Sequence, residues 1–340
     1  MDFFGLDIGS YTLKVVQLAK SGKEYRLLSF GSGPSTRKSL ASEADADLTA
    51  LAEAVKKLHR EAKISTKNVT AALPQDQVFT RTVNLPPLSD DELRSAIKWE
   101  AEQYVPIPLE EANVAHQIVG RIKVDNREKI QVLIVAAPTR LIDKTLKILK
   151  SAGLNTVGLE TEIIAMARSL VPPKGESAIL VDLGAKATDM AVVEGGLVVF
   201  SRSISTAGEA LTRAIATSLG LDPTQAEAYK KAYGADPRKL EGKVREAIGP
   251  ILDVVVKEIE KTAEYYRSET KRIVKRIILS GGTAGLPEVV SLMASKLSLE
   301  IQVGDPFDQV KIDESLKKQL SQTQAPLFAA AVGLAMKDVG

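Results

Sequence analysis

One short pattern occurs twice in this chain, about half the chain length apart. The segment GLDIGSYTLKVVQL (5–18) aligns with LVDLGAKATDMAVV (180–193), which places Asp7 on Asp182 and Gly9 on Gly184. Each copy is typical of a strand that ends in Asp-apolar-Gly, a tight turn and a returning strand. Glycine suits such a turn because a side chain would obstruct it. The repeat therefore predicts two related α/β halves that face each other.

The segments around each copy alternate between strand and helix patterns. In the first half we expect strands at 25–30 and 69–73 and helices at 45–62 and 139–152. In the second half we expect helices at 208–219 and 286–297, strands at 276–279 and 300–303, and an almost wholly helical stretch over 222–275. Such alternation predicts α/β domains with a cleft between them.

A different pattern interrupts the first half. Strands are predicted at 78–85, 113–124 and 129–136, and Ser89 to Glu92 form a capping box that opens a helix ending at Tyr104. This is a β-α-β-β insertion. The predicted division is 1–77 with 139–172 for the first half, 78–138 for the insertion, 173–217 with 280–324 for the second half, 218–279 for a helical subdomain, and 325–340 for a final helix that packs back on the first half.

The paired turns also predict a ligand. Glycine turns allow backbone N–H groups to approach an anion such as phosphate. Asp7 and Asp182 would repel that phosphate unless a cation lay between them, and Mg²⁺ held through water satisfies both. A single such turn is more often a local strand end, but two copies, with Gly281-Gly282 before a helix, favour a magnesium nucleotide clamped between hairpins.

Composition excludes other classes of function. The chain contains no cysteine, so disulfides, thiolate nucleophiles and cysteine metal sites are ruled out. A net charge of +2 over 340 residues gives no reason to expect nucleic-acid binding. We also expect no transmembrane span, because no apolar run reaches 18 residues, and a cytoplasmic location, because no export signal is recognisable.

The motifs resemble those of the actin, Hsp70 and sugar kinase superfamily over nearly the whole chain. Residues 7–14, 181–189 and 278–287 resemble its two phosphate motifs and its adenosine motif. Residues 160–170 and the final helix resemble its two connecting helices. The resemblance implies an actin-like fold of duplicated ribonuclease H-like halves that binds ATP and Mg²⁺, with Asp7 and Asp182 near the metal. The implied nucleotide-binding residues are Asp7, Gly9, Ser10, Tyr11, Lys14, Asp182, Gly184, Lys186, Thr188, Gly208, Glu227, Lys230, Gly281, Gly282, Thr283 and Leu286.

Two carboxylates are candidates for catalysis by the same resemblance. Asp182 would orient water or hold the metal, while Glu160 is either a water-activating carboxylate or a helix-start residue favoured by the helix dipole. The chain departs from the superfamily at Ala185 and Lys186, where relatives usually carry glycine. Side chains there hinder approach to the γ-phosphate, so we expect nucleotide binding with slow or no hydrolysis.

The insertion identifies the branch of the superfamily. A β-α-β-β insertion before the first connecting helix resembles FtsA and PilM, and WEAEQYVPIPLEE (99–111) is characteristic of the PilM family. That resemblance implies a type IV pilus assembly scaffold, peripheral at the inner membrane, that binds the cytoplasmic N-terminal tail of PilN and links PilN and PilO to the assembly machinery. The pilus assembly ATPase and a second copy of the chain are further expected partners.

Trp99 is the candidate anchor for the partner, together with Tyr104 and Pro106. On the predicted helix it lies far from the apolar stripe of Leu93 and Ile97, so it either packs against residues 106–109 or borders a partner-binding groove. Two other functions stay open. An active ATPase or small-molecule kinase needs a further base near the γ-phosphate, and an FtsA-like division protein would carry a basic amphipathic terminal helix, which we do not find here.

Overall fold

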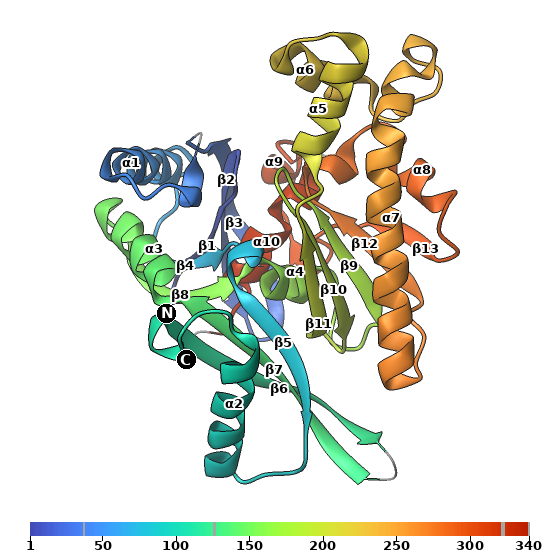
Figure 1. Ribbon diagram of the computed structural model, residues 1–340. Helices are drawn as coiled ribbons and strands as arrows, with labels where there is room; N and C mark the ends of the chain where they lie inside the picture. The colour runs from blue at the N-terminus through green and yellow to red at the C-terminus, as the bar shows by residue number, and fades with distance from the viewer. Residues whose placement is uncertain (37, 125–126, 321–323, 339–340) are drawn as a thin grey trace.

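The computed structural model describes residues 1–36, 38–124, 127–320 and 324–338. Two α/β halves lie side by side, and a smaller inserted unit extends below them in Figure 1. No helix of the described ranges is long and apolar enough to cross a bilayer. The elements not introduced below are α6 (Pro223–Tyr233), α9 (Glu314–Lys317) and the 3-10 helices Ser39–Ala41, Gln75–Gln77, Leu109–Glu111 and Leu240–Gly242.

The two halves contain sheets of the same strand order. The first sheet runs β3-β2-β1-β4-β8, made of β1 (Phe4–Ile8), β2 (Thr12–Ser21), β3 (Glu24–Pro34), β4 (Asn68–Leu73) and β8 (Asn155–Thr161). The second runs β11-β10-β9-β12-β13, made of β9 (Ala178–Leu183), β10 (Thr188–Glu194), β11 (Leu197–Ile204), β12 (Arg276–Ser280) and β13 (Glu300–Val303). In each, the first three strands are antiparallel and the next two are parallel. The duplication predicted from the repeat is confirmed.

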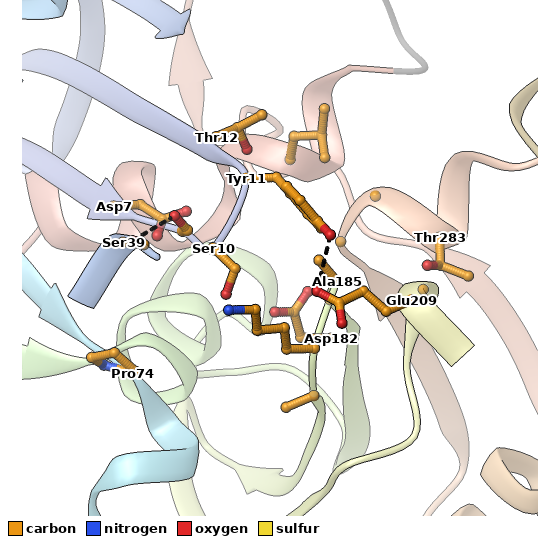
Figure 2. Close-up of a pocket in the computed structure, with 18 of the residues that line it drawn as sticks. Asp7, Ser10, Tyr11, Thr12, Ser39, Pro74, Asp182, Ala185, Glu209 and Thr283 are labelled. Atoms are coloured by element: carbon orange, nitrogen blue, oxygen red, sulfur yellow. Dashed lines mark hydrogen bonds between the residues drawn. The ribbon is translucent and has the colours of Figure 1, made fainter. Parts of the chain in front are cut away.

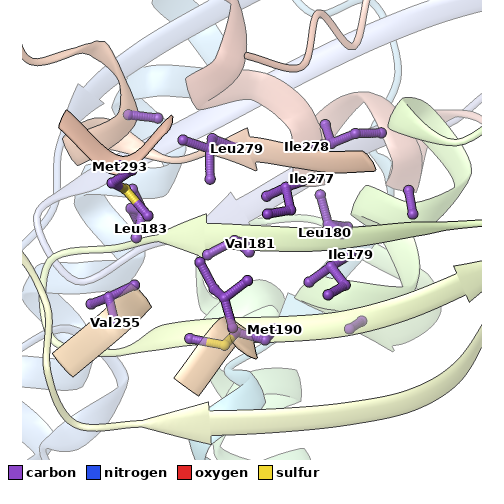
Figure 3. Close-up of a cluster of buried hydrophobic side chains, with 14 of the residues drawn as sticks. Ile179, Leu180, Val181, Leu183, Met190, Val255, Ile277, Ile278, Leu279 and Met293 are labelled. Atoms are coloured by element: carbon purple, nitrogen blue, oxygen red, sulfur yellow. The ribbon is translucent and has the colours of Figure 1, made fainter. Parts of the chain in front are cut away.

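The core of the second half surrounds its two central strands. Leu180 and Val181 of β9 and Ile277 of β12 are fully buried. Figure 3 shows them in one cluster with Val255, from α7 (Lys243–Thr270), and Met293, from α8 (Val289–Ala294). Central strands covered on both faces are continuously apolar rather than alternating, which is the pattern of β9 and β12. α5 (Gly208–Leu219) packs against α7 on the same side.

Two helices cross between the halves. α4 (Glu162–Leu170) and α10 (Ala329–Ala335) pack closely on each other, and α10 also lies on β1. A Cβ atom added to Gly333 would lie 1.7 Å from the carbonyl oxygen of Ala165, so the crossing depends on glycine. On the outer side of the first half, α1 (Asp45–Glu61) packs against α3 (Thr139–Ser151).

The insertion forms the predicted β-α-β-β unit. It consists of β5 (Phe79–Leu85), α2 (Asp90–Tyr104), β6 (Ala112–Val124) and β7 (Arg127–Pro138), in the sheet order β5-β7-β6. The predicted capping box of Ser89 and Glu92 is present at the start of α2. α2 covers one face of the sheet, with Ile97 and Val132 in a shared core. On the other face, Leu133 joins the core of the second half, so the insertion touches both halves.

Four sequence expectations differ from the structure. Residues 160–170 do not form one helix, because β8 continues to Thr161 and α4 begins at Glu162. The helix expected at 286–297 is only 289–294, since Pro287 and the left-handed Glu288 (φ 56°) precede it. The final helix is divided into a 3-10 turn, Ala325–Phe328, and α10. A short strand, β14 (Val310–Lys311), pairs with β3, so the chain rejoins the first sheet earlier than residue 325.

Candidate functional site

A cleft of about 970 Å³ lies between the halves. The β1–β2 turn, the β9–β10 turn and the 3-10 helix Gly282–Gly285 after β12 converge on it. A volume of this size accommodates a ligand as large as a nucleotide. The predicted residues that line the cleft are Asp7, Gly9, Ser10, Tyr11, Lys14, Asp182, Gly184, Lys186, Gly208, Glu227, Lys230, Gly281, Gly282, Thr283 and Leu286.

Two predicted site residues do not line the cleft. Thr188 is fully buried, and its hydroxyl donates to the carbonyl oxygen of Thr206 at 2.6 Å. Glu160 is a strand residue whose carboxylate accepts from Arg168 at 2.7 and 2.8 Å and from Lys337 at 3.0 Å. Burial raises the pKa of Glu160, but the charges and hydrogen bonds of Arg168 and Lys337 outweigh burial, so the pKa lies below its ordinary value. This placement argues against the catalytic role predicted for Glu160, because Arg168 and Lys337 already neutralise its charge. It also argues against a helix-start role, because Glu160 lies within β8 and α4 begins at Glu162.

The two turn glycines occupy equivalent positions. A Cβ atom added to Gly9 would lie 2.7 Å from the carbonyl oxygen of Thr12, and one added to Gly184 would lie 2.7 Å from that of Ala187. Neither turn could keep its shape with a larger residue at this position. The sequence repeat is thus a repeat of backbone geometry, and it directs both turns at the same cleft.

The first hairpin carries a buried ion pair. Lys14 lies opposite Asp7 in the register of β1 and β2, and its Nζ atom donates to Asp7 Oδ2 at 2.9 Å. Burial lowers the pKa of Lys14, but the charge and hydrogen bond of Asp7 raise it above its ordinary value, so the lysine stays charged. The second oxygen of Asp7, Oδ1, is buried without a hydrogen-bond partner. That orphaned oxygen is a free acceptor at the floor of the cleft.

The second hairpin has a carboxylate where the first has the lysine. Asp189, which occupies the place of Lys14 in the repeat, lies opposite Asp182. Burial is the main cause that raises the pKa of Asp182 to about 6 and that of Asp189 to about 7. Oδ1 of Asp189 also lacks a partner. Sequence reasoning missed Asp189, although its alignment with Lys14 was the available signal.

Glu162 is a further acidic group of the cleft. It is the first residue of α4, and the backbone N–H of Gln75 donates to its Oε2 atom at 3.2 Å. Burial, with the nearby charge of Asp7, raises its pKa well above the ordinary value. Its position, two residues after Glu160, could not be read from the sequence because it depends on where β8 ends.

These raised pKa values predict that the folded protein is more stable at mildly acidic pH than at pH 8. Between about pH 4 and 7 the folded protein keeps protons on Asp182 and Asp189 that the unfolded chain releases, so folding is favoured at the lower pH. We expect the free energy of unfolding to be about 2–3 kcal/mol higher at pH 5.5 than at pH 8, measured by urea denaturation. Asp189→Asn should remove most of this difference, whereas exposed Asp91→Asn should leave it. If both variants showed the same difference in unfolding free energy between pH 5.5 and pH 8, the assignment of this pH dependence to Asp189 would be wrong.

Tyr11 joins the two halves across the cleft. Figure 2 shows its ring extending from the β1–β2 turn toward Glu209, on the first turn of α5. The Tyr11 hydroxyl donates to Glu209 Oε1 at 3.0 Å. Partial burial, then this hydrogen bond, raises the pKa of Tyr11. The contact therefore links the two halves at the opening of the cleft.

Removing that hydrogen bond should loosen the cleft. An exposed hydrogen bond to a charged group contributes about 1 kcal/mol, so Tyr11→Phe should raise the open population about fivefold. We expect faster amide exchange over residues 9–12 and 208–212 by hydrogen–deuterium exchange mass spectrometry. Tyr25→Phe is the matched control, since its hydroxyl donates to the Met336 carbonyl, away from the cleft. Unchanged exchange in Tyr11→Phe would show that the contact does not hold the halves together.

A second buried cation organises the far wall of the cleft. Lys230 Nζ donates to the Gly208 carbonyl at 3.0 Å and to Thr212 Oγ1 at 2.9 Å, and it pairs with Glu227 at 2.6 Å. Thr212 also donates to Glu227 at 2.6 Å. The group ties α6 to the start of α5, next to Thr283. Glu227 and Lys230 thus have mutual partners in the cleft wall.

The acidic groups do not form a closed metal site. Within the described ranges, no three Asp, Glu, His or Cys side chains converge as metal ligands. Mg²⁺ is nevertheless suited to sites that supply one or two carboxylates, with water and phosphate oxygens completing its shell. Asp7 and Asp182, which both line the cleft, provide such a donor set.

The predicted partner residues lie on the outer surface of the insertion. Trp99 is 61% exposed, which argues against the interpretation that its ring is buried against residues 106–109. Tyr104 is 44% exposed rather than part of the buried stripe, and the Arg81 guanidinium stacks on its ring at 3.2 Å. Pro106 is also exposed.

Duplicated sheets joined by crossing helices around a cleft define an actin-like protein, as predicted. The sequence profile of the family described as type IV pilus assembly protein PilM matches residues 5–339, so the chain belongs to the PilM family. The solved structure of a PilM–PilN type IV pilus biogenesis complex matches 99% of this chain and 98% of that one, with 29% identity and a TM-score of 0.83.

The chain is also similar to more distant relatives. The cell division protein FtsA of Streptococcus pneumoniae is 23% identical over 89% of this chain and 75% of its own. The structure of MreB5 of Spiroplasma citri bound to ADP matches 98% of this chain and 95% of that chain, with 15% identity and a TM-score of 0.50. These likenesses agree with the actin-like fold and with the FtsA-like branch predicted from the insertion.

Proposed function

We propose that this protein is an ATP-binding, actin-like scaffold of type IV pilus assembly that binds the cytoplasmic N-terminal tail of PilN. The observation that carries the proposal is the combination of membership in the PilM family with a cleft formed by two equivalent glycine turns. Through PilN it would lie on the cytoplasmic side of the inner membrane and link the PilN and PilO complex to the assembly machinery. The ADP bound by the MreB5 relative supports a nucleotide as the ligand.

The residues of the cleft suit a magnesium nucleotide. The glycine turns present backbone to the phosphates, and Lys14 supplies a buried positive charge beside them. Asp7 and Asp182 would hold Mg²⁺ through water, and the bound ion would neutralise phosphate charge. The Asp7 Oδ1 atom, which has no hydrogen-bond partner within the protein, would accept a hydrogen bond from the water bound to Mg²⁺. Glu227 and Lys230 would lie near the ribose and base.

The cleft is poorly suited to rapid hydrolysis. Burial and the nearby charge of Asp7 raise the pKa of Glu162 well above its ordinary value, so less of this carboxyl group is in the deprotonated form that a general base requires. Ala185 and Lys186 also carry side chains at the second turn. We expect steady-state turnover below about one per second. Turnover of several per second, or phosphate transfer to a small molecule, would favour the enzyme alternative instead.

The insertion is the proposed partner surface. The PilM–PilN complex supports PilN as the partner, and the exposed Trp99 ring on α2 offers an aromatic anchor of the kind common at interfaces. Tyr104 and Pro106 follow at the end of the same helix. A short tail could lie against these side chains without any rearrangement of the core.

A fluorescence titration tests this surface, because Trp99 is the single tryptophan of the chain. Adding the N-terminal cytoplasmic peptide of a PilN protein should shift its emission to the blue as the indole loses water. Trp99→Ala should weaken binding at least tenfold by calorimetry, which corresponds to about 1.4 kcal/mol. Ile273→Ala is the control, since Ile273 is 70% exposed but lies outside the insertion. Unchanged affinity in Trp99→Ala would move the binding site elsewhere.

A further inference from the structure

The loop between α7 and β12 presents an apolar side chain to solvent among basic residues. Residues 271–276 read Lys-Arg-Ile-Val-Lys-Arg and include no acidic residue. Ile273 is 70% exposed, and only Met1 exceeds it among the large apolar side chains of the described ranges. The next residue, Val274, is 2% exposed and belongs to the core of the second half. Val274 therefore anchors the loop, and Ile273 remains on its outer side.

This loop lies at the end of the second half that faces away from the cleft. Arg276 pairs with Ala178 at the first position of β9, whereas the turn that lines the cleft follows the last position of that strand. The Ser177 hydroxyl donates to the Ile273 carbonyl oxygen at 3.4 Å, which ties the loop to the segment before β9. In Figure 1 the C-terminal end of α7 and the inserted unit both extend toward the lower side of the molecule. The loop is thus on the same side as the insertion.

Basic residues outnumber acidic ones around Ile273. Two carboxylates pair with the loop, since Lys275 binds Glu176 at 2.6 Å and Arg272 binds Glu194 at 3.0 Å. Such exposed pairs contribute little stability. Glu269, on the last turn of α7, is a third acidic neighbour, so five cations accompany three carboxylates. The cations that form no ion pair within the described part of the chain are Lys174, Lys271 and Arg276.

We propose that residues 271–276, together with Lys174, dock on the anionic surface of a lipid bilayer. The basic side chains would face the lipid phosphates, and the Ile273 side chain would enter the boundary between headgroups and acyl chains. An apolar side chain among cations matches that boundary, because negative charge and hydrocarbon adjoin there. A nucleic acid would engage the cations but leave Ile273 in water, so the exposed isoleucine favours lipid.

Such a contact is weak by itself. One apolar side chain and a few cations bind less strongly than a single acyl chain, which already needs a second attachment for stable anchoring. A PilN tail held by the insertion would be that attachment, and this step rests on the proposed function. The loop would then orient the protein on the membrane, with the cleft directed away from the bilayer, rather than recruit it. The lipid contact itself requires neither the tail nor a nucleotide.

Vesicle cosedimentation of the full chain tests the contact without PilN. Lipid at about 5 mM detects binding far weaker than that of one acyl chain, about 10⁴ M⁻¹. We expect at least fivefold more bound protein with equal parts of phosphatidylglycerol and phosphatidylcholine than with phosphatidylcholine alone, and release at about 0.5 M salt because screening strengthens. Lys174→Gln with Lys271→Gln should lower binding at least threefold. Lys239→Gln with Lys243→Gln is the matched control, since it removes the same charge at the opposite end of α7.

A fluorescence measurement reports whether residue 273 enters the bilayer. Ile273→Trp in a Trp99→Phe background places the single indole of the chain on the loop, and anionic vesicles should shift its emission to the blue. Val254→Trp in the same background is the control. Val254 is also exposed, but it lies about 25 Å along α7 from the loop, so its emission should not change.

Equal binding by the two double lysine variants, or an emission from Ile273→Trp that anionic vesicles leave unchanged, would overturn the proposal. So would a wild type that binds a DNA duplex but no vesicles at the same salt, because the loop would then be a nucleic-acid site. A wild type that binds neither would also refute the lipid contact. The ATP and PilN titrations would still decide the proposed function separately, since they use no lipid.

Discussion

Lys14→Met should abolish ATP binding and destabilise the protein. Lys14 is the buried partner of Asp7, so its loss leaves a carboxyl group of 5% exposure without a counter-charge. Breaking a buried ion pair from one side costs about 3–5 kcal/mol. The same change removes the buried positive charge at the floor of the cleft, and we expect ATP affinity to fall at least a hundredfold, about 2.7 kcal/mol. Urea denaturation and calorimetric titration with magnesium ATP measure the two effects.

A paired variant separates folding from ligand binding. Lys14→Met combined with Asp7→Asn leaves no unpaired charge in the first hairpin, so most of the lost stability should return. ATP binding should not return, because both the cation and the carboxylate are absent. If the double variant bound ATP as the wild type does, the first hairpin would not be part of the nucleotide site. If Lys14→Met alone kept full stability, the ion pair would not matter to the fold.

Gly333→Ala should prevent stable folding. The new Cβ atom would lie 1.7 Å from the Ala165 carbonyl oxygen and 2.4 Å from its carbonyl carbon, both of which are backbone atoms that cannot rotate away. α4 and α10 would have to separate, and the buried residues along their crossing would lose packing. We expect the free energy of unfolding to fall by more than about 4 kcal/mol, or little folded protein to be recovered.

Gly33→Ala is the matched control for this crossing. Gly33 lies on β3, and the nearest atom to an added Cβ would be Leu58 Cδ1 at 3.6 Å, an ordinary contact. Its stability should stay within about 1 kcal/mol of the wild type, because the variant loses only backbone freedom in the unfolded chain. A melting temperature for Gly333→Ala equal to that of Gly33→Ala would show that the two crossing helices tolerate separation.

The sequence predicted those parts of the molecule that depend on local pattern. The repeat of Asp7-Gly9 in Asp182-Gly184 predicted two equivalent hairpins, and the sheets have the same strand order because each half folds by the same rules. The capping box at Ser89 and the alternation of apolar residues predicted the insertion. The hairpins and the insertion could be predicted because local propensity and periodicity indicate them without any knowledge of distant contacts.

Distant contacts explain where the sequence-based predictions failed. Glu160 and Glu162 are two residues apart, and only the end of β8 decides that Glu162 lines the cleft while Glu160 binds Arg168 and Lys337. A boundary between strand and helix is set by packing against neighbouring elements, which a propensity pattern does not record. Asp189 was missed because its importance lies in facing Asp182 across two strands.

The sequence by itself determined the duplicated actin-like architecture, the insertion and most residues that line the cleft, because a repeated turn repeats its geometry wherever it occurs. Only the tertiary structure decided which charged groups lie close together and which surfaces stay exposed. It brought Glu162, Asp182 and Asp189, whose pKa values are raised, to one cleft, joined Tyr11 to Glu209 across that cleft, and left Trp99 exposed. Burial and desolvation depend on which segments meet in space, and that meeting is a property of the whole chain.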